Sequence, residues 1–367
     1  TRSALAVPAL GRGGMEPRQL RVALVGFGAV NTALLSLLEG KRQRLLERHG
    51  LTVLCVGASD SRGATVNPAG LDARGLLEHK AAGTSVASFP GGQSCADAEA
   101  MLTELGDSGY DVLVEGSPVN LTNGGVGLKV VRRALSTGRS TVLANKAPLV
   151  LAFDELVALA AAEEPQQRPR LLYSATVCGG LPVLNVGRRD LGVTAAEFTR
   201  VEGVFNSTTN YVLSEMGQGR SFDSALKEAQ RLGIAEADPS LDIDGLDTAN
   251  KLVIIANAVL GHPAKLVDVD VTGIRGVTPE AITEAARRNE VYKLLASAEA
   301  TEGGGFRLSV RPVALPVGGF LASICGWEMG VVFHTDLFEV VSLKIDEPSV
   351  TPTAAAVLRD VLHCAGC

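Results

Sequence analysis

The segment "AEADPSLDIDGLDTANK", residues 235 to 251, carries residue types that can do chemistry, because it gathers five carboxylates and ends on a lysine. Pro239 and Gly245 interrupt regular structure, so its first part is predicted to be a loop. The apolar pattern that follows predicts a helix, on which Asp247 and Lys251 share one face. Carboxylates can bind a cationic group of a small molecule, and a lysine ammonium can stabilise an oxyanion or protonate it. The alternative is a solvated acidic loop, with Asp247 favoured by the helix dipole.

A second candidate site lies near the start of the chain, where "RVALVGFGAV" (21–30) is a β-branched apolar run that ends in Gly-x-Gly. A helical pattern follows, and then a second apolar run, "LTVLCVGASD" (51–60). Strand, glycine turn, helix and strand form a βαβ unit of the dinucleotide-binding kind. In such a unit Gly26 permits the tight turn, and Gly28 lets the backbone approach a pyrophosphate.

The residues after this turn refine the nucleotide-site hypothesis. Ala29 and Val30 open the helix, whose free N–H groups can bind phosphates. Asn31 stands where the dinucleotide fingerprint has its third glycine, which serves close packing of helix on strand. Asp60 closes the second strand, where an acid can hold the ribose 2′-hydroxyl of NAD, whereas Arg62 can instead bind the 2′-phosphate of NADP. Both cofactors stay open, as does the alternative that this polar stretch is a plain turn.

Two further apolar runs, "YDVLVEGSP" (110–118) and "RSTVLANKAPLV" (139–150), each end in polar or charged residues. In an open α/β sheet the ligand lies beyond the carboxyl ends of the strands. We therefore expect one cleft to be faced by the side chains that follow these two strands, which are Glu115, Ser117, Asn145 and Lys146. Of these, Ser117 and Asn145 are assigned to the cofactor. We predict a Rossmann-type dinucleotide-binding domain over residues 20–149, and thus the α/β fold class.

From about residue 150 the pattern changes. Two strand-like runs with polar or glycine breaks (171–185 and 198–219) alternate with helical patterns. They predict an α+β catalytic and dimerisation domain with a mainly β sheet over residues 150–340. The segment 341–367 ends in a helical pattern that is expected to return to the first domain. Residues 1–19 are treated as a leader or a scar outside the fold.

Composition excludes several classes of protein. Hydrophobic residues make up 46% of the chain, charged residues 20%, and the net charge is −6, as in ordinary globular proteins. No basic stripe suggests a nucleic-acid partner, and no run of about eighteen apolar residues suggests a membrane span. Six scattered cysteines lack zinc-site spacing, which predicts free thiols in a reducing compartment. We expect a cytoplasmic protein, or an organellar one if residues 1–14 are a targeting remnant.

Taken in order, these motifs resemble the homoserine dehydrogenase family. The matching segments are "GFGAV", "LANKAPLV", "SATVCGGLPV", "GVFNSTTNYVL" and "GIAEADPSLDIDGLDTANKLVI". The resemblance spans roughly residues 20 to 360, and implies a monofunctional member without a C-terminal regulatory domain. It implies the reversible reduction of L-aspartate 4-semialdehyde to L-homoserine with NADP or NAD, in threonine and methionine biosynthesis. It also implies a homodimer formed through the sheet of the second domain.

Matched residue by residue, the resemblance also assigns roles. It marks Lys146 and Lys251 as the catalytic lysines near the reacting oxygen. The residues that it marks as substrate contacts or supports are Glu236, Asp242, Asp247, Thr176 and Gly179.

Several positions depart from the family pattern. Some members hold a monovalent cation, Na⁺ or K⁺, through a glutamate and backbone carbonyls; here Ser174 replaces the glutamate, while Val177 and Gly179 supply the carbonyls. Cys178 replaces a glycine, and "KIDEPSVTPTAAAV" (344–357) has no glycine where members have a Gly-Ala-Gly turn near the cofactor. Two alternatives therefore stay open. One is a dehydrogenase of the same fold acting on another small amino-acid aldehyde, and the other is a dinucleotide-binding paralogue with weakened or lost catalysis.

Overall fold

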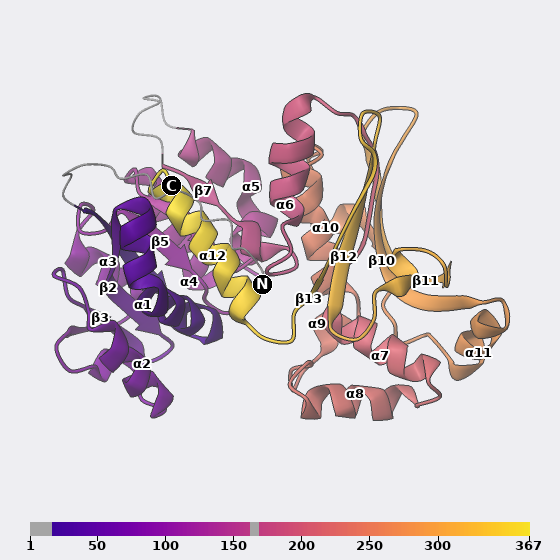
Figure 1. The fold of residues 1–367 in the computed structure, drawn as a ribbon, viewed down its shortest axis with the longest axis horizontal. Helices are drawn as coiled ribbons and strands as arrows, with labels where there is room; N and C mark the ends of the chain where they lie inside the picture. The colour runs from indigo at the N-terminus through magenta and orange to yellow at the C-terminus, as the bar shows by residue number, and fades with distance from the viewer. Residues whose placement is uncertain (1–16, 162–168) are drawn as a thin grey trace, which may run out of the picture.

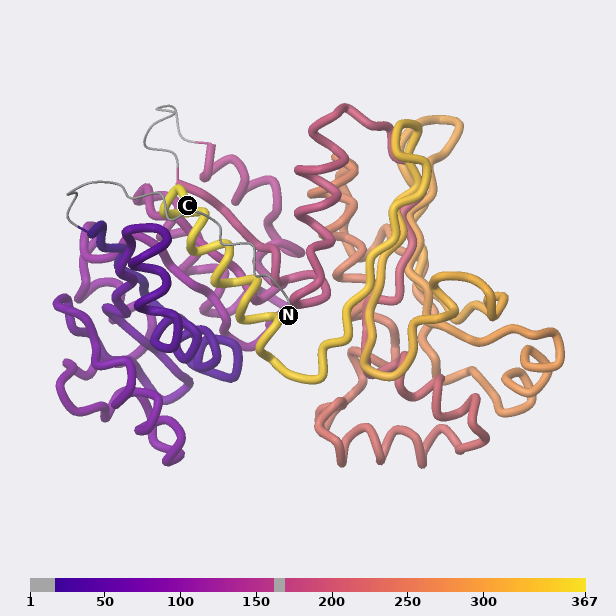
Figure 2. Tube along the Cα trace, viewed as in Figure 1, coloured from indigo at the N-terminus to yellow at the C-terminus, as the bar shows by residue number. Residues whose placement is uncertain are grey.

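The computed structural model describes residues 17–161 and 169–367, which form two units side by side (Figure 1). Figure 2 shows that the chain builds the first unit, passes into the second, and returns to the first in its last residues. The first unit holds a largely parallel sheet and the second a largely antiparallel one. The predicted α/β class, with a Rossmann-type sheet and a second, mainly β sheet, is confirmed. No helix among the described residues is long and apolar enough to cross a bilayer.

The first unit alternates strands and helices, as its apolar runs predicted. Its elements are β1 (Arg18–Val25), α1 (Ala29–His49), β2 (Leu51–Asp60), β3 (Gly63–Val66), α2 (Ala73–Ala81), β4 (Gln93–Cys95), α3 (Ala98–Leu105), β5 (Val112–Glu115), α4 (Gly125–Ser136), β6 (Ser140–Leu143), α5 (Ala147–Ala160) and β7 (Leu171–Leu172). The strand order is β4-β3-β2-β1-β5-β6-β7, with β2, β1, β5, β6 and β7 parallel. Central strands such as β5 are buried along their whole length, which explains their continuous apolar sequences.

The second unit places helices on one face of a six-stranded sheet. Its elements are α6 (Val183–Asn185), β8 (Phe198–Val204), α7 (Ser207–Gly217), α8 (Phe222–Arg231), α9 (Ser240–Ile243), α10 (Leu246–Ala258), β9 (Val269–Val271), α11 (Pro279–Arg287), β10 (Glu290–Ala300), β11 (Phe306–Pro316), β12 (Glu328–Thr335) and β13 (Glu339–Asp346). The chain then returns to the first unit as α12 (Thr351–Cys364). The strand order is β13-β12-β8-β10-β11-β9. Helices α7 and α10 pack on the central strand β10.

Two runs that were read as strands contain helices. In the run 171–185 the strand is limited to Leu171–Leu172, and the rest is turns and the short helix α6. The run 198–219 is a strand as far as Val204 and a helix from Ser207. The change has a local cause, because the Asn206 side chain accepts a hydrogen bond from the Thr209 N–H and caps α7.

The end of the chain joins the two units. Helix α12 lies along α1 of the first unit (Figure 1). Its fully buried Asp360 accepts hydrogen bonds from the N–H and hydroxyl of Ser174 at 2.8 and 2.7 Å, and burial raises the pKa of that carboxyl. Glu347, on the connection from β13 to α12, accepts a hydrogen bond from the Gly180 N–H at 3.1 Å. The two places where the chain crosses between units are thus tied together.

Candidate active site

A cavity of about 910 Å³ lies between the units, at the carboxyl ends of β1, β2, β5 and β6. The wall opposite these strand ends comes from the segment 236–250 of the second unit. The predicted site residues that line it are Gly26, Gly28, Val30, Asp60, Ser117, Asn145, Lys146, Glu236, Asp242 and Asp247. The predicted site residues that are not among its lining residues are Ala29, Arg62, Thr176, Val177, Gly179 and Lys251. The glycine turn and the acidic segment, far apart in sequence, therefore share one cavity.

The glycine turn forms a cradle for a dinucleotide. Gly26 has φ +78°, and a Cβ there would lie 2.4 Å from the Ser117 nitrogen, so glycine is required. Gly28 faces open space, since a Cβ there would meet no atom within 4 Å. It is also the N-cap of α1 and has no side-chain cap, which leaves helix N–H groups free for an anion. These residues fit a pyrophosphate.

Asn31, at the third fingerprint position, closes the turn with its side chain. It is fully buried, and its Nδ2 donates to the carbonyls of Val25 and Gly26 at 2.9 and 3.0 Å. A Cβ on the facing Gly116 would lie 3.1 Å from that Nδ2. Glycine at position 116 therefore makes room for the asparagine, and the close approach of α1 to the sheet is kept.

The end of the cavity beside β2 holds an ion pair that the sequence did not reveal. Lys80 Nζ lies 2.7 Å from Asp60 Oδ2, and Lys80 lines the cavity. Burial opposes ionisation of Asp60, but hydrogen bonds from Lys80, the Arg62 and Val86 N–H groups and Ser85 outweigh it and lower the pKa to about 2. The Arg62 guanidinium donates instead to the Gly83 carbonyl at 3.0 Å. The cation nearest this end is thus Lys80.

Glu115 was expected to face the cleft, but it is fully buried and does not line the cavity. Burial raises its pKa to about 7, although hydrogen bonds from Ser117 act against this shift. Asn145 Nδ2 lies 3.5 Å from the Ser117 hydroxyl. Glu115 therefore lies beneath Ser117 and Asn145, which are the residues that reach the cavity surface.

On the second-unit wall of the cavity, one carboxylate is shared by two lysines. Lys146 Nζ, from the first unit, pairs with Asp247 Oδ1, and Lys251 Nζ lies 2.8 Å from Asp247 Oδ2. Lys251 Nζ also donates to the Phe205 carbonyl at 2.5 Å. Burial opposes the charge on Asp247, but the two ammonium groups hold its pKa far below the usual range. Likewise the charge of Asp247 outweighs burial and raises the pKa of Lys251, so this lysine stays an ammonium.

Further acids line the cavity next to this cluster. Glu236 and Asp238 come from the loop before α9, and Asp242 from α9 itself. Burial and the nearby charge of Asp247 raise the pKa of Asp242. The Asn206 amide group lies between Asp242 and Asp247 and donates to both. This end of the cavity suits a small molecule with a cationic group beside a reacting oxygen.

The turn predicted to hold a monovalent cation is held by protein groups. Ser174 donates its N–H and hydroxyl to the carboxylate of α12, and Glu347 accepts from Gly180. The Glu347 carboxylate fills the space beside Gly179, where a Cβ would meet it at 2.5 Å. Thr176 donates its hydroxyl to a neighbouring backbone carbonyl at 2.7 Å. Among the described residues there is no group of three or more His, Cys, Asp or Glu that could ligate a metal.

Lys80, Asn206 and Asn250 are the site residues that sequence reasoning missed. Asn250 lines the cavity one turn after Asp247, and its buried Oδ1 has no hydrogen-bond partner. Its position at i+3 from Asp247 was a usable signal. Asn206 stands at the end of a strand before a helical pattern, which is a cap signal. Nothing in the local sequence placed Lys80 against Asp60.

Comparison with known proteins covers both units. The family model for homoserine dehydrogenase matches residues 182–362. The NAD(+)-dependent homoserine dehydrogenase of Pseudomonas canavaninivorans is 34% identical over 346 residues, or 94% of this chain and 96% of that protein. A crystal structure of homoserine dehydrogenase from Thermoplasma acidophilum is similar with a TM-score of 0.79 at 26% identity, over 95% of this chain and 100% of that one. A hyperthermophilic archaeal homoserine dehydrogenase in complex with NADPH gives 0.78 at 25% identity, over 95% and 98%.

The cradle at Gly28 can be tested by filling it. Because a Cβ at this position meets no protein atom, Gly28→Val is expected to fold with a melting temperature near that of the wild type. Its side chain would stand where the pyrophosphate approaches, so the dissociation constant for NADPH or NADH should rise by at least about tenfold, as for the loss of about 1.4 kcal/mol. Fluorescence titration of the cofactor measures this. Unchanged affinity in the folded variant would place the pyrophosphate elsewhere.

Proposed function

Because the chain belongs to the homoserine dehydrogenase family, and so catalyses the reversible NAD(P)-dependent reduction of L-aspartate 4-semialdehyde to L-homoserine in amino-acid biosynthesis, we propose that the cluster of Lys146, Asp247 and Lys251 is its catalytic centre. The observation that supports this is the meeting of a lysine from each unit on one buried carboxylate, in the cavity that also holds the glycine cradle.

Both lysines keep donors that are not used on Asp247, and Lys146 is the one of the two that lines the cavity. An ammonium has three donors. Lys251 uses one on Asp247 and one on the Phe205 carbonyl, which leaves one, and Lys146 uses one on Asp247, which leaves two. Donors that are held in place by such contacts stabilise the alkoxide in the transition state. In the direction of reduction an ammonium also supplies the proton that the new hydroxyl needs.

The rest of the cavity binds and orients the reactants. When bound, the nicotinamide cofactor delivers or accepts the hydride. Ser117 and Asn145 lie at the ends of β5 and β6, beside Lys146, and are suited to hold the nicotinamide end. Glu236 and Asp242 line the second-unit wall and are suited to bind the substrate's ammonium group. With both reactants fixed, the reaction gains from orientation.

Cofactor choice is proposed to depend on Lys80 and not on Arg62. Four hydrogen bonds already occupy the oxygens of Asp60, two on each. Lys80 uses one donor on Asp60 and faces the cavity, so it retains donors for the 2′-phosphate of NADP. The Arg62 guanidinium is bonded elsewhere.

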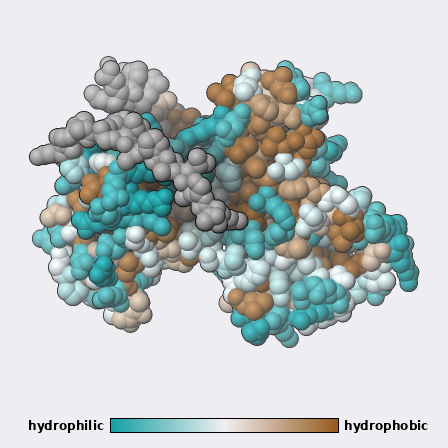
Figure 3. Space-filling model, in the orientation of Figure 1, coloured by the Kyte–Doolittle hydropathy of each residue, from teal (hydrophilic) through white to brown (hydrophobic). Residues whose placement is uncertain are grey.

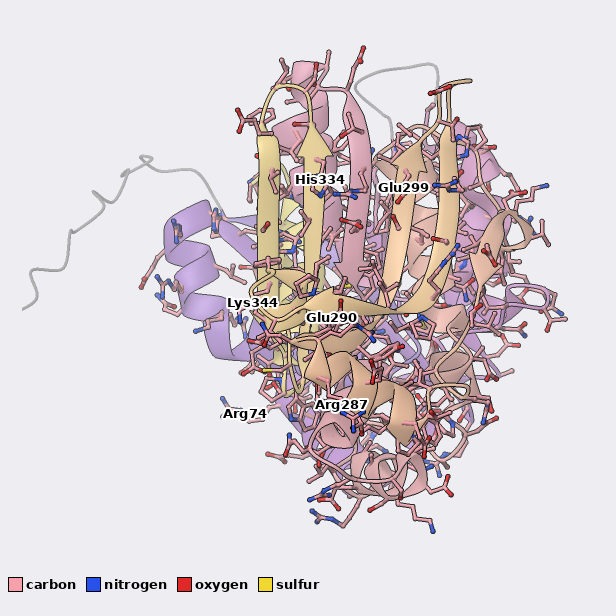
Figure 4. The ribbon with its side chains drawn as sticks, turned by 90° about the vertical axis from the view of Figure 1, so that its right-hand side faces the viewer. Arg74, Arg287, Glu290, Glu299, His334 and Lys344 are labelled. Atoms are coloured by element: carbon pink, nitrogen blue, oxygen red, sulfur yellow. The ribbon has the colours of Figure 1, made fainter. Side chains whose placement is uncertain are left out.

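We also propose that the enzyme is a homodimer that pairs through the open face of the second sheet. Figure 4 looks onto this face, where His334 and Glu299 lie. The paired strands place residues of both charge signs there, and pairs such as Arg200–Glu202 and Arg307–Glu299 lie at 3.2 and 2.5 Å. Both signs on one patch suit an isologous contact, in which each patch meets its own copy. In the space-filling view apolar residues gather beside β12 and β13 (Figure 3). In the turn between these strands Leu337 and Phe338 are exposed, as is Val340 near the start of β13.

A cytoplasmic location, or an organellar one if residues 1–14 target the chain, is proposed on the six cysteines. They are Cys55, Cys95, Cys178, Cys325, Cys364 and Cys367, and all six are free thiols, as proteins of reducing compartments have.

The catalytic cluster predicts the effect of removing either lysine. Lys146→Ala and Lys251→Ala should each lower kcat for homoserine oxidation by roughly 10²- to 10⁴-fold, because an acid–base or oxyanion contact is lost. Steady-state rates with homoserine and NADP or NAD measure this, with a melting curve for each variant. Lys227→Ala, at an exposed lysine of α8, is the matched control and should keep the wild-type rate. Wild-type turnover in the Lys251 variant would reduce that residue to a structural charge.

The cofactor proposal predicts a change in the ratio of two dissociation constants. Lys80→Ala should weaken NADPH by roughly 10- to 100-fold relative to NADH, as for the loss of a charge-assisted hydrogen bond of about 1.5–3 kcal/mol. Arg62→Ala is the control and should change the ratio little. The opposite result, with the ratio set by Arg62, would reject the proposal.

The dimer proposal predicts a solution mass of twice the 38.1 kDa of the chain. Arg307→Glu, at an exposed position of the open face, should shift the protein toward monomer, because a reversed charge enters the contact. Lys41→Glu on α1 of the first unit should leave the mass unchanged. Light scattering after size exclusion gives the mass, and a monomeric wild-type protein would rule out the dimer.

A further inference from the structure

The amide of Asn206 lies at a junction of the site. This residue follows β8, caps α7, and is 5% exposed. Its Oδ1 accepts from the Thr209 N–H at 2.8 Å. Because a backbone N–H can only donate, this contact identifies the oxygen of the amide and fixes the direction of its NH₂ group.

Both hydrogens of this NH₂ group go to carboxylates. Nδ2 lies 2.7 Å from Asp242 Oδ1 and 2.9 Å from Asp247 Oδ2. One amide thus spans two acids, one on α9 and the other on α10. A helix cap requires the oxygen alone, so the NH₂ group has a separate task.

The two acids that share the amide have unequal surroundings. Asp247 is paired with two ammonium groups. Asp242 has no lysine or arginine within ion-pair distance in the described part of the chain, and it lines the cavity. Burial and the charge of Asp247 raise the pKa of Asp242, whereas Thr208, Lys251 and Asn206 lower it. The charged groups around it are Asp247 and Lys251 on α10, Lys146 of the first unit, and Glu236 and Asp238 of the preceding loop.

We propose that Asn206 is a positioning residue that gives these two acids separate roles. Its amide holds Asp247 against the lysine pair, and it keeps Asp242 as an ionised carboxylate that binds the ammonium group of the substrate. This inference rests on the proposed function and deepens it. Without the NH₂ group, two carboxylates would face each other with no donor between them. Asp242 would then bind a proton more readily and hold the substrate less well.

Asn206→Ser tests the NH₂ group and spares the cap, since serine caps helices about as well as asparagine. The value of kcat/KM for homoserine should fall by roughly 10- to 100-fold, as expected for one or two hydrogen bonds to charged groups, mainly through KM. The acid limb of its pH profile should move to higher pH, because Asp242 must be ionised to bind the ammonium group. The dissociation constant for the cofactor should stay close to that of the wild type.

The matched control is Asn210→Ser in the same helix. Asn210 is also fully buried, and its Nδ2 donates to the carbonyls of Gly326 and Glu328, each at 3.2 Å, and not to the site acids. This variant should melt at a lower temperature and keep the wild-type acid limb. If Asn206→Ser shows wild-type kcat/KM and an unmoved acid limb in an active enzyme, the positioning role is rejected.

A measurement without turnover separates this inference from the proposed function. A carboxyl with a raised pKa holds its proton longer in the native state than in the unfolded state, so its contribution to stability falls as pH rises through that range. The melting temperature of Asn206→Ser should therefore fall further below that of the wild type at pH 8 than at pH 5. In an Asp242→Asn background this pH dependence should vanish. A difference that stays constant with pH contradicts the inference, whereas a wild-type protein that does not oxidise homoserine contradicts the proposed function alone.

Discussion

The ion triad of Lys146, Asp247 and Lys251 is the interaction on which the cleft depends. Asp247 is 8% exposed, and a carboxylate taken out of water is costly unless it is paired and hydrogen-bonded. Here both oxygens are used, by an ammonium from each unit and by the Asn206 amide. Breaking a buried pair typically costs about 3–5 kcal/mol, because a charge is left without a partner. The triad therefore constrains how the two units meet as well as what the site can do.

The C-terminal segment, which returns from the second unit to the first, also constrains how the two units meet. The chain leaves the first unit near Ser174 and comes back through Glu347, and these two crossings are linked by hydrogen bonds to Asp360 and Gly180. A carboxylate that accepts backbone N–H groups fixes the position of the main chain and not only of a side chain. The turn from Ser174 to Gly180 is held in this protein by acids from its own C-terminal segment. The cavity thus keeps its shape through contacts that lie outside it.

Charged groups of both signs are distributed along the cavity. Lys80 lies near the end of β2, free helix N–H groups lie at the glycine turn, Lys146 is paired with Asp247, and further acids line the wall from the second unit. In the proposed function, each group would contact a part of a bound reactant that carries the opposite charge. The two acids differ in their ion pairs. Asp247 is paired with both lysines, whereas Asp242 has no lysine or arginine within ion-pair distance among the described residues.

The sequence by itself determined the features that depend on local geometry. The apolar run before Gly26 and Gly28 predicted the strand and the glycine turn, and the spacing of Asp247 and Lys251 predicted their contact at i, i+4. These inferences succeed because helix rise and strand alternation are fixed by the backbone. The strand-like reading of 198–219 was wrong beyond Val204, because the Asn206 cap overrode the apolar pattern there. Only the tertiary structure brought Lys146 to Asp247, 101 residues away, paired Lys80 and not the Arg62 guanidinium with Asp60, and buried Glu115 beneath the cavity. Such contacts arise from how whole elements dock to bury apolar surface, and no local period in the sequence encodes that docking.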